Sequence, residues 1–171
     1  VKGALIVIIL AVWIPHYSFA NSDYVLPYPS AMPGNRLYRL NLVKEKILKY
    51  WYFGDFGQFL YNLKQSDKYL VEAKTLFEYK QYLLAFKALE KSEAYFRQTL
   101  PNLLEAQKEE KNTNANRDIL RQASSKHIEV LSEINQNIPA NFDWTPEKSA
   151  PTTLNLSEKI KDSIRIRKKY L

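Results

Sequence analysis

The hydrophobic positions of the chain recur at helical spacing from about residue 35 to residue 138. Four apolar stripes are separated by short breaks, which predicts four helices. Asn35 and Asp55 stand where caps of the first and second helices are expected, and Pro139 ends the fourth. The first stripe contains Leu37, Leu40, Ile47, Leu48 and Trp51, and the second Phe56, Phe59, Leu60, Leu63, Leu70 and Phe77. The third contains Tyr82, Phe86, Leu89, Phe96, Leu100 and Leu103, and the fourth Ile119, Leu120, Ala123, His127, Val130, Leu131, Ile134 and Ile138.

The boundary between the second and third helices carries no ordinary turn residue. No glycine, proline, asparagine or serine lies between Glu78 and Tyr82. Either one helix runs on from Asp55, or a tight turn near Lys80-Gln81 makes a tetratricopeptide-like hairpin. We favour the hairpin because a helix of about 55 residues would be several times longer than usual. Pro101 is expected to kink or restart the third helix.

Residues 21–35 form a tyrosine and proline segment ahead of the helices. Pro27, Pro29 and Pro33 hold φ at about −65° and push their predecessors toward extended geometry, so the segment is predicted to be extended. Its apolar side chains are too numerous for a free linker, and we expect them to pack on the helices that follow. The candidate interaction residues of this segment are Tyr24, Leu26 and Tyr28.

The C-terminal part of the chain carries much of the net charge. Residues 139–156 contain three prolines and predict a linker, which Phe142 and Trp144 anchor to the bundle. Residues 157–171, capped by Ser157, predict a basic amphipathic helix with six basic residues against two acidic ones. This helix either lies on anionic lipid or an acidic cell-wall polymer, or docks its isoleucines on the bundle. Its candidate interaction residues are Lys159, Arg165, Arg167, Lys168 and Lys169.

These elements predict an all-α protein. Residues 36–138 are expected to form a bundle of roughly four helices, with an extended proline-rich segment before it and a short helix after it. At 171 residues the chain has room for one domain and enough interior to bury a core.

The first residues resemble an export signal. Lys2 precedes an uncharged apolar run from Gly3 to Ile14, and Ser18-Phe19-Ala20 resembles a cleavage site. The run is shorter than the roughly 20 apolar residues of a membrane span, so residues 1–20 are predicted to be a signal peptide, with a retained signal anchor as the alternative. The protein is therefore expected to be exported.

Composition excludes several kinds of site. The chain has no cysteine, which excludes disulfides, thiolate metal sites and a cysteine nucleophile. The net charge is +7, and removing residues 1–20 takes away only Lys2. Because residues 157–171 carry +4 of the remaining +6, the body of the protein is nearly balanced.

The proline and tyrosine segment also suggests a family. The pattern Tyr24-x-Leu26-Pro27-Tyr28-Pro29, followed by Pro33 and by Leu37-Tyr38-x-Leu40, resembles the start of domain-of-unknown-function family 5667. Further similarity lies in Ala73, Leu76, the stretch Tyr82-x-x-Ala85-x-x-Ala88-Leu89 and Lys126-His127-x-x-Val130-Leu131. The resemblance covers roughly residues 24 to 138. It implies export and a helical body, and it carries no known reaction, cofactor or catalytic residue.

No constellation of reactive residues stands out. His127 lies on the fourth apolar stripe, where packing in or beside the core is favoured over a metal or catalytic role. The carboxylates of Glu105, Glu109 and Glu110 lie beside lysines and are expected in solvent; a hydrolase would need such groups to converge with Asp143 in a pocket.

The expected function is therefore that of a non-enzymatic, exported interaction or scaffold protein of the cell envelope, with no cofactor. Its expected partner is an envelope protein or an anionic polymer, and not nucleic acid. The alternative is peripheral membrane contact through residues 157–171. A carboxylate hydrolase is the least favoured interpretation, and the sequence leaves the oligomeric state open.

Overall fold

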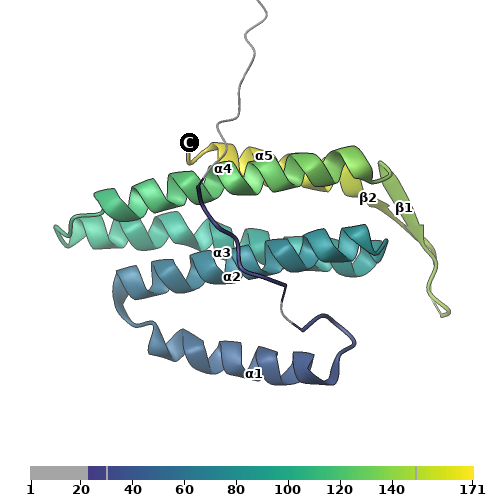
Figure 1. The fold of residues 1–171 in the computed structure, drawn as a ribbon, viewed down its shortest axis with the longest axis horizontal. Helices are drawn as coiled ribbons and strands as arrows, with labels where there is room; N and C mark the ends of the chain where they lie inside the picture. Colours follow the sequence, from purple (N-terminus) through teal and green to yellow (C-terminus); the bar gives the residue numbers. More distant parts are fainter. Residues whose placement is uncertain (1–22, 30, 149) are drawn as a thin grey trace, which may run out of the picture.

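The computed structural model describes residues 23–29, 31–148 and 150–171. The predicted signal segment, residues 1–20, lies outside the described residues. The all-α prediction is confirmed: the described chain folds into helices with one small antiparallel sheet (Figure 1). The helices are α1 (Arg36–Trp51), α2 (Gly54–Glu78), α3 (Tyr82–Lys108), α4 (Asn114–Asn137) and α5 (Leu156–Lys168), and the strands are β1 (Asn141–Trp144) and β2 (Thr152–Asn155).

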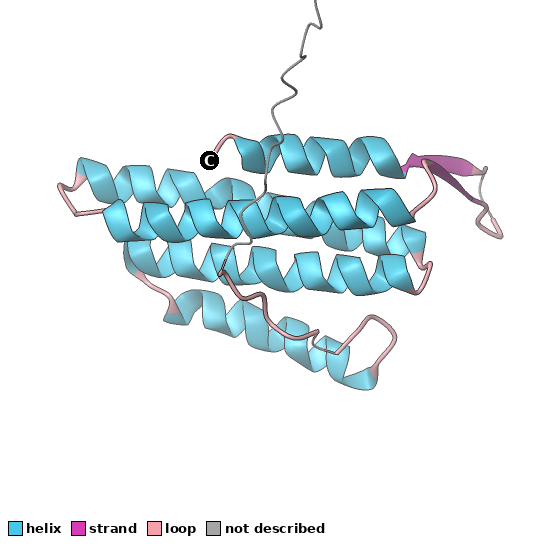
Figure 2. Cartoon of the chain, turned by 45° about the horizontal axis from the view of Figure 1, so that its top comes forward, coloured by secondary structure: helices cyan, strands magenta, loops and turns pink. Residues whose placement is uncertain are grey.

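Helices α2 to α5 form the bundle, and α1 lies outside it, along α2 (Figures 1 and 2). The core has two apolar clusters along the bundle. One cluster lies near the α2–α3 turn and contains Leu70, Leu76, Leu89, Leu131, Leu156 and Ile160. The other lies toward the opposite end and contains Phe59, Leu63, Phe96, Leu103, Leu120 and Ile166. Four helices enclose these two clusters, but they are not the four predicted within residues 36–138, because α5 takes the place that was expected for α1.

The predicted hairpin between α2 and α3 is confirmed, and its turn works without glycine. Lys80 adopts the left-handed conformation with φ +58°. The backbone N–H of Lys80 donates to the carbonyl of Phe77 (3.0 Å) and that of Gln81 to the carbonyl of Leu76 (2.8 Å), which is the hydrogen-bond pattern of a Schellman cap. The end of α3 repeats this pattern, with Glu110 at φ +60°. Lysine and glutamate stand where glycine is usual, so no glycine marks either turn.

Two of the three predicted caps differ from the structure. Asn35 caps α1 as expected, because its Oδ1 accepts from the backbone N–H of Leu37 (2.8 Å). The cap of α2 is Phe53 and not Asp55, which lies in the first turn. Helix α5 begins at Leu156, one residue before the predicted cap Ser157, whose hydroxyl donates to Oδ1 of Asn135 (2.9 Å).

The predicted linker contains a β-hairpin. Strands β1 and β2 pair in register from Asn141 with Asn155 to Trp144 with Thr152. Phe142 packs against the first core cluster, with its ring centroid 5.1 Å from that of Tyr82. Trp144 is 38% exposed and does not anchor the hairpin as expected. The prolines of this stretch did not suggest this pairing, which brings the two ends of the connection side by side ahead of α5.

Helix α5 is part of the core. Leu156 and Ile160 have no exposed surface, and Ile166 is 7% exposed. Of the two alternatives left open for this helix, docking of its isoleucines on the bundle is therefore the arrangement observed.

The N-terminal segment packs only in part. The hydroxyl of Tyr24 donates to Oδ2 of Asp67 on α2 (2.6 Å), and Leu26 packs against the first core cluster. Tyr28, by contrast, is 96% exposed, so the expectation that it packs on the helices is wrong.

Candidate functional site: the outward face of helix α1

Helix α1 presents its polar side to the rest of the protein. Glu45 is its one buried residue and faces α2. Both Glu45 carboxylate oxygens are used: one accepts from the ammonium of Lys68, and the other from the hydroxyl of Tyr69 (2.8 Å). The hydroxyl of Tyr61 donates to the Glu45 carbonyl (3.2 Å), and that of Tyr38 to Oε1 of Glu72 (3.0 Å). We call these six residues, Tyr38, Glu45, Tyr61, Lys68, Tyr69 and Glu72, the tyrosine seam.

Aromatic contacts extend the tyrosine seam to α3. The Tyr69 and Tyr95 rings stack at 5.8 Å, and Tyr61 meets Tyr95 edge to face at 6.0 Å. The ammonium of Lys68 lies over the Tyr69 ring, 4.4 Å from its centroid. Burial raises the pKa of Tyr69, and the hydrogen bond that its hydroxyl donates to the Glu45 carboxylate raises it further, so the phenol stays protonated. The seam therefore fixes α1 through protonated tyrosine hydroxyls and carboxylates.

Glu72 is the strained member of the seam. Its Oε2 atom is buried without a hydrogen-bond partner, and burial raises the pKa of its carboxyl group against the stabilising effects of Tyr38, Lys68 and Lys91. A buried carboxylate that is only half satisfied costs stability, so the polar attachment of α1 is retained at some energetic expense.

The turn after α1 also holds its position. The side-chain amide of Gln58 donates to the carbonyls of Tyr52 and Lys49, two of the orphan carbonyls at the end of α1. A Cβ atom on Gly57 would lie 3.0 Å from the carbonyl carbon of Tyr52, so a side chain at this position would push against the Tyr52 backbone. The close contact between Gly57 and the Tyr52 backbone therefore helps to set the angle between α1 and α2.

The apolar face of α1 points away from the bundle. In the structure this stripe is mostly exposed, so the expectation that it belongs to the bundle interior is wrong. The exposed fractions are 58% for Leu37, 65% for Leu40, 56% for Val43, 57% for Ile47 and 76% for Trp51. Tyr50 and Phe53 continue this surface and are 85% and 83% exposed. We call these seven residues the outward face.

The exposed charges on α1 are all positive. Five basic residues are exposed, and Glu45, the one acidic residue of the helix, is taken up by the seam. These basic residues are Arg36, Arg39, Lys44, Lys46 and Lys49. Lys44 lies with Leu40, Val43, Ile47, Leu48 and Trp51 around a shallow apolar depression. The outward face is thus an apolar strip flanked by positive charge.

A second polar cluster lies inside the bundle. Nε2 of His127 lies 2.7 Å from Oδ1 of Asp67, and Nε of Arg167 donates to Nδ1 of His127 (3.0 Å). The Arg167 guanidinium also donates to the hydroxyls of Ser92 (2.8 Å) and Ser163 (2.6 Å). We call these five residues the core network.

The hydrogen bonds of the core network assign the state of His127. A guanidinium N–H is always a donor, so Nδ1 must accept, and the single ring proton lies on Nε2 and is donated to Asp67. The histidine is therefore neutral, in agreement with burial lowering the pKa of His127 to about 4. Burial also lowers the pKa of Arg167, to about 10, which leaves it charged at neutral pH.

The core network has the geometry of a structural cluster. His127, Ser92 and Arg167 have no exposed surface. Both ring nitrogens of His127 are engaged by Asp67 and Arg167, so neither is available to activate the Ser92 hydroxyl. The prediction that His127 packs in the core is confirmed. The role of Arg167 differs from the prediction: it lies in the core and not on an exposed basic face.

The other candidate residues of α5 are distributed around the helix. Lys159 pairs with Glu93 (2.9 Å) and Arg165 with Asp162 (3.0 Å), whereas Lys168 and Lys169 are exposed. The apolar residues of α5 are used in the core, which leaves its basic residues without an apolar face beside them.

The carboxylates considered for hydrolysis do not converge. Glu105 pairs with Lys108 (2.7 Å) and Glu109 with Lys111 (2.5 Å), and both carboxylates are 59% exposed. Asp143 is exposed on β1 and accepts from the hydroxyl of Thr153 (2.6 Å). Within the described part of the chain, no three His, Cys, Asp or Glu side chains gather as a metal site would require.

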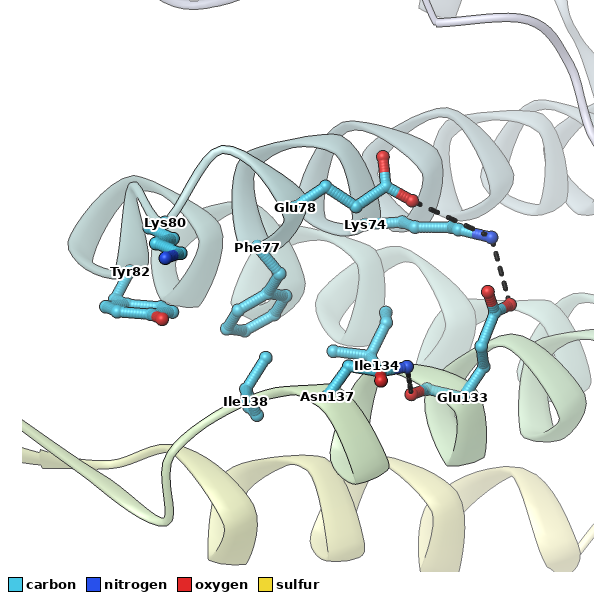
Figure 3. Close-up of a pocket in the computed structure, with 9 residues that line it drawn as sticks. All are labelled: Lys74, Phe77, Glu78, Lys80, Tyr82, Glu133, Ile134, Asn137 and Ile138. Atoms are coloured by element: carbon cyan, nitrogen blue, oxygen red, sulfur yellow. Dashed lines mark hydrogen bonds and ion pairs between the residues drawn. The ribbon is translucent and has the colours of Figure 1, made fainter.

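A hollow of about 240 Å³ lies where the ends of α2 and α4 meet the start of α3 (Figure 3). Phe77, Ile134 and Ile138 form its apolar wall, and Lys74 closes one side by pairing with Glu133 (2.9 Å) and Glu78 (3.9 Å). The two carboxylates already share this lysine, and Lys80 lies at the rim of the hollow in the α2–α3 turn.

The family described as Domain of unknown function (DUF5667) matches residues 30–141. The chain belongs to this family. The resemblance suggested by the proline and tyrosine segment is therefore confirmed. No significant match was found among curated proteins or solved structures.

The DUF5667 match includes α1, the whole tyrosine seam and His127. It ends at residue 141, before α5, so Arg167 lies outside it. The outward face thus belongs to the part of the chain that defines the family, and the core network joins that part to the C-terminal helix. The periodicity predicts the apolar stripe on α1 but not its exposure. The signal that could have indicated the exposure is Glu45, the one acidic residue of α1, which lies opposite that stripe among five basic residues.

Proposed function

We propose that this DUF5667 protein is a non-enzymatic, exported interaction or scaffold protein of the cell envelope and that it binds its partner through the outward face of α1. The observation that carries this proposal is the exposure of seven large apolar residues, six on α1 and Phe53 just after it, on the side opposite the tyrosine seam. Contiguous apolar surface on a folded protein marks an interaction site, because leaving it in water has a free-energy cost. Export is supported by the sequence of residues 1–20.

The tyrosine seam supports the same function. A helix that served only to cover the core would turn its leucines inward, whereas α1 is held by buried carboxylates and tyrosine hydroxyls. Such an attachment keeps the apolar residues available for contact.

Binding through α5 has less support. Its leucine and isoleucines pack in the core, and Arg167 is buried with them. Lys168 and Lys169 remain as exposed charges that an anionic polymer would meet. The hydrolase interpretation has less support, because the carboxylates of Glu105, Glu109 and Asp143 are exposed and line no common pocket.

Photo-crosslinking in intact cells tests the proposal. A photoreactive residue at Ile47 should give crosslinked species in the envelope fraction, identified by mass spectrometry. The matched control carries the same residue at Glu90, an exposed position on α3. Crosslinks from Ile47 that are absent from Glu90 support the outward face. Equal patterns from both positions, or recovery of the protein outside the envelope fraction, would overturn the proposal.

A further inference from the structure

We infer that the outward face of α1 binds the surface of an anionic lipid bilayer, with the helix lying in the plane of the interface. This inference rests on the proposed function in one respect: it names the partner of the same surface.

The first support is the shape of the surface. Leu40, Val43 and Ile47 lie on successive turns of one side of α1, opposite Glu45, so they can meet a flat surface together. Helix α1 stands at the edge of the molecule, beyond α2, and the bundle does not extend past it on that side (Figures 1 and 2). A bilayer can therefore approach the outward face without contact with the core helices.

The second support is charge. The exposed part of α1 carries five basic residues and no acidic one. An apolar strip flanked by lysine and arginine is the pattern of helices that lie on membranes, because the apolar side chains enter the acyl boundary while the basic ones reach anionic headgroups.

The third support is the aromatic end of the outward face. Tyr50, Trp51 and Phe53 are each more than 75% exposed, at the end of α1. Tryptophan and tyrosine favour the boundary between lipid and water, where the ring is in apolar surroundings and its polar group stays hydrated.

Charge also argues against a second copy of the chain as the occupant. Two outward faces packed together would bring two sets of five exposed basic residues close, and like charges at such an interface are unfavourable. A self-complementary apolar interface is usually poor in charged residues, which this surface is not.

Flotation of the full chain with vesicles tests the inference. The vesicles contain phosphatidylcholine alone or with about 30% phosphatidylglycerol. We expect at least tenfold tighter binding to the anionic vesicles at low salt, declining as salt rises. The double variant Leu40→Ser and Ile47→Ser should weaken binding at least tenfold, and Arg39→Gln with Lys46→Gln should weaken it several-fold and reduce its salt dependence.

A charge-matched control lies on α5. Lys168→Gln with Lys169→Gln removes the same charge as the α1 pair and should leave binding unchanged. Each variant is first compared with the wild type by thermal unfolding, and we expect little change because all the substituted residues are exposed. Insertion is read from a blue shift of tryptophan fluorescence on vesicle binding, which Trp51→Phe should largely remove.

Three results would overturn the inference. Equal binding to both kinds of vesicle would remove the role of charge, and undiminished binding of the Leu40 and Ile47 variant would assign binding to another segment, such as residues 3–14. Concentration-dependent dimerisation lost in Ile47→Ser would identify a second copy as the occupant. If vesicles fail while Ile47 still crosslinks to an envelope protein, only the lipid inference fails; if both fail, the proposed function fails with it.

Discussion

Removal of Arg167 should lower the stability of the fold strongly. It is a buried cation bonded to His127, Ser92 and Ser163, and its guanidinium lies 4.8 Å from the Phe96 ring centroid. Arg167→Met should lower the free energy of unfolding by about 3–5 kcal/mol, because it leaves Asp67 buried without a cation nearby.

The matched control for Arg167 is Arg165→Met on the same helix. Arg165 is largely exposed and pairs with Asp162, so its loss should change the free energy of unfolding by less than about 0.5 kcal/mol. Urea unfolding measures both variants. Equal effects would show that the core network adds nothing beyond surface charge.

His127 should make stability depend on pH. Burial holds its pKa at about 4, below the ordinary value of 6.5, with Asp67 on α2 and Arg167 on α5 facing the ring. The unfolded chain binds a proton as pH falls below 6.5, whereas the folded chain does so only near 4. The contribution of neutral His127 to the free energy of unfolding is therefore fully present above pH 6.5. It decreases between pH 6.5 and pH 4, by about 3 kcal/mol in total.

Comparison with His127→Gln isolates this effect. Between pH 7 and pH 5 the wild type should lose about 2 kcal/mol more than the variant, which has no titrating group at this position. Urea unfolding at the two pH values is the measurement. Parallel losses in wild type and variant would contradict the neutral assignment of His127.

Among the elements, the turns that end α2 and α3 offer a stabilising change. Lys80 and Glu110 both hold the left-handed conformation that favours glycine. Lys80→Gly and Glu110→Gly should each raise the free energy of unfolding by about 1 kcal/mol, or the melting temperature by about 3 °C. The control Lys87→Gly, at an exposed position within α3, should lower stability by about 1 kcal/mol. Destabilisation by all three substitutions would contradict the cap geometry.

The hydrophobic periodicity predicted the helices and the hairpin, but not whether the apolar face of each helix points to the core or to solvent. The apolar residues of α1 and α4 follow the same spacing, yet His127 and Leu131 of α4 are buried while Leu40 of α1 is exposed. The difference arises from Glu45, whose partners Tyr69 and Lys68 lie more than twenty positions away. A hydrophobic pattern defines a face; partners distant in sequence decide where that face points.

At the scale of the molecule, α5 completes the fold. It contributes Leu156 and Ile160 to the core and Arg167 to the core network. A chain ending at Asn155 should lose cooperative thermal unfolding, because it exposes one side of the core and leaves Asp67 without its cation. Circular dichroism measures the transition.

The control for α5 keeps the helix and removes two exposed charges. Lys168→Gln with Lys169→Gln should melt as the wild type does. A sharp, unshifted transition in the shortened chain would show instead that residues 156–171 are a tail that the bundle does not need.

No helix in the described part of the chain is both long and apolar enough to cross a membrane. Contact with a bilayer through α1, as inferred above, requires only that one face enters the interface. The molecule thus combines a helical bundle with one helix, α1, whose polar side faces the bundle and whose apolar side faces solvent.

Local spacing and short motifs were enough to predict the helical class, the hairpin without a turn residue, the place of His127 in the core and the family. The same patterns did not predict that α5 belongs to the core, that Arg167 is buried and that the apolar face of α1 meets solvent. Each of these depends on pairing across the fold: Arg167 meets His127 forty positions away, and Glu45 meets Tyr69 twenty-four positions away. Such pairings follow from the packing of whole elements, which no local pattern records.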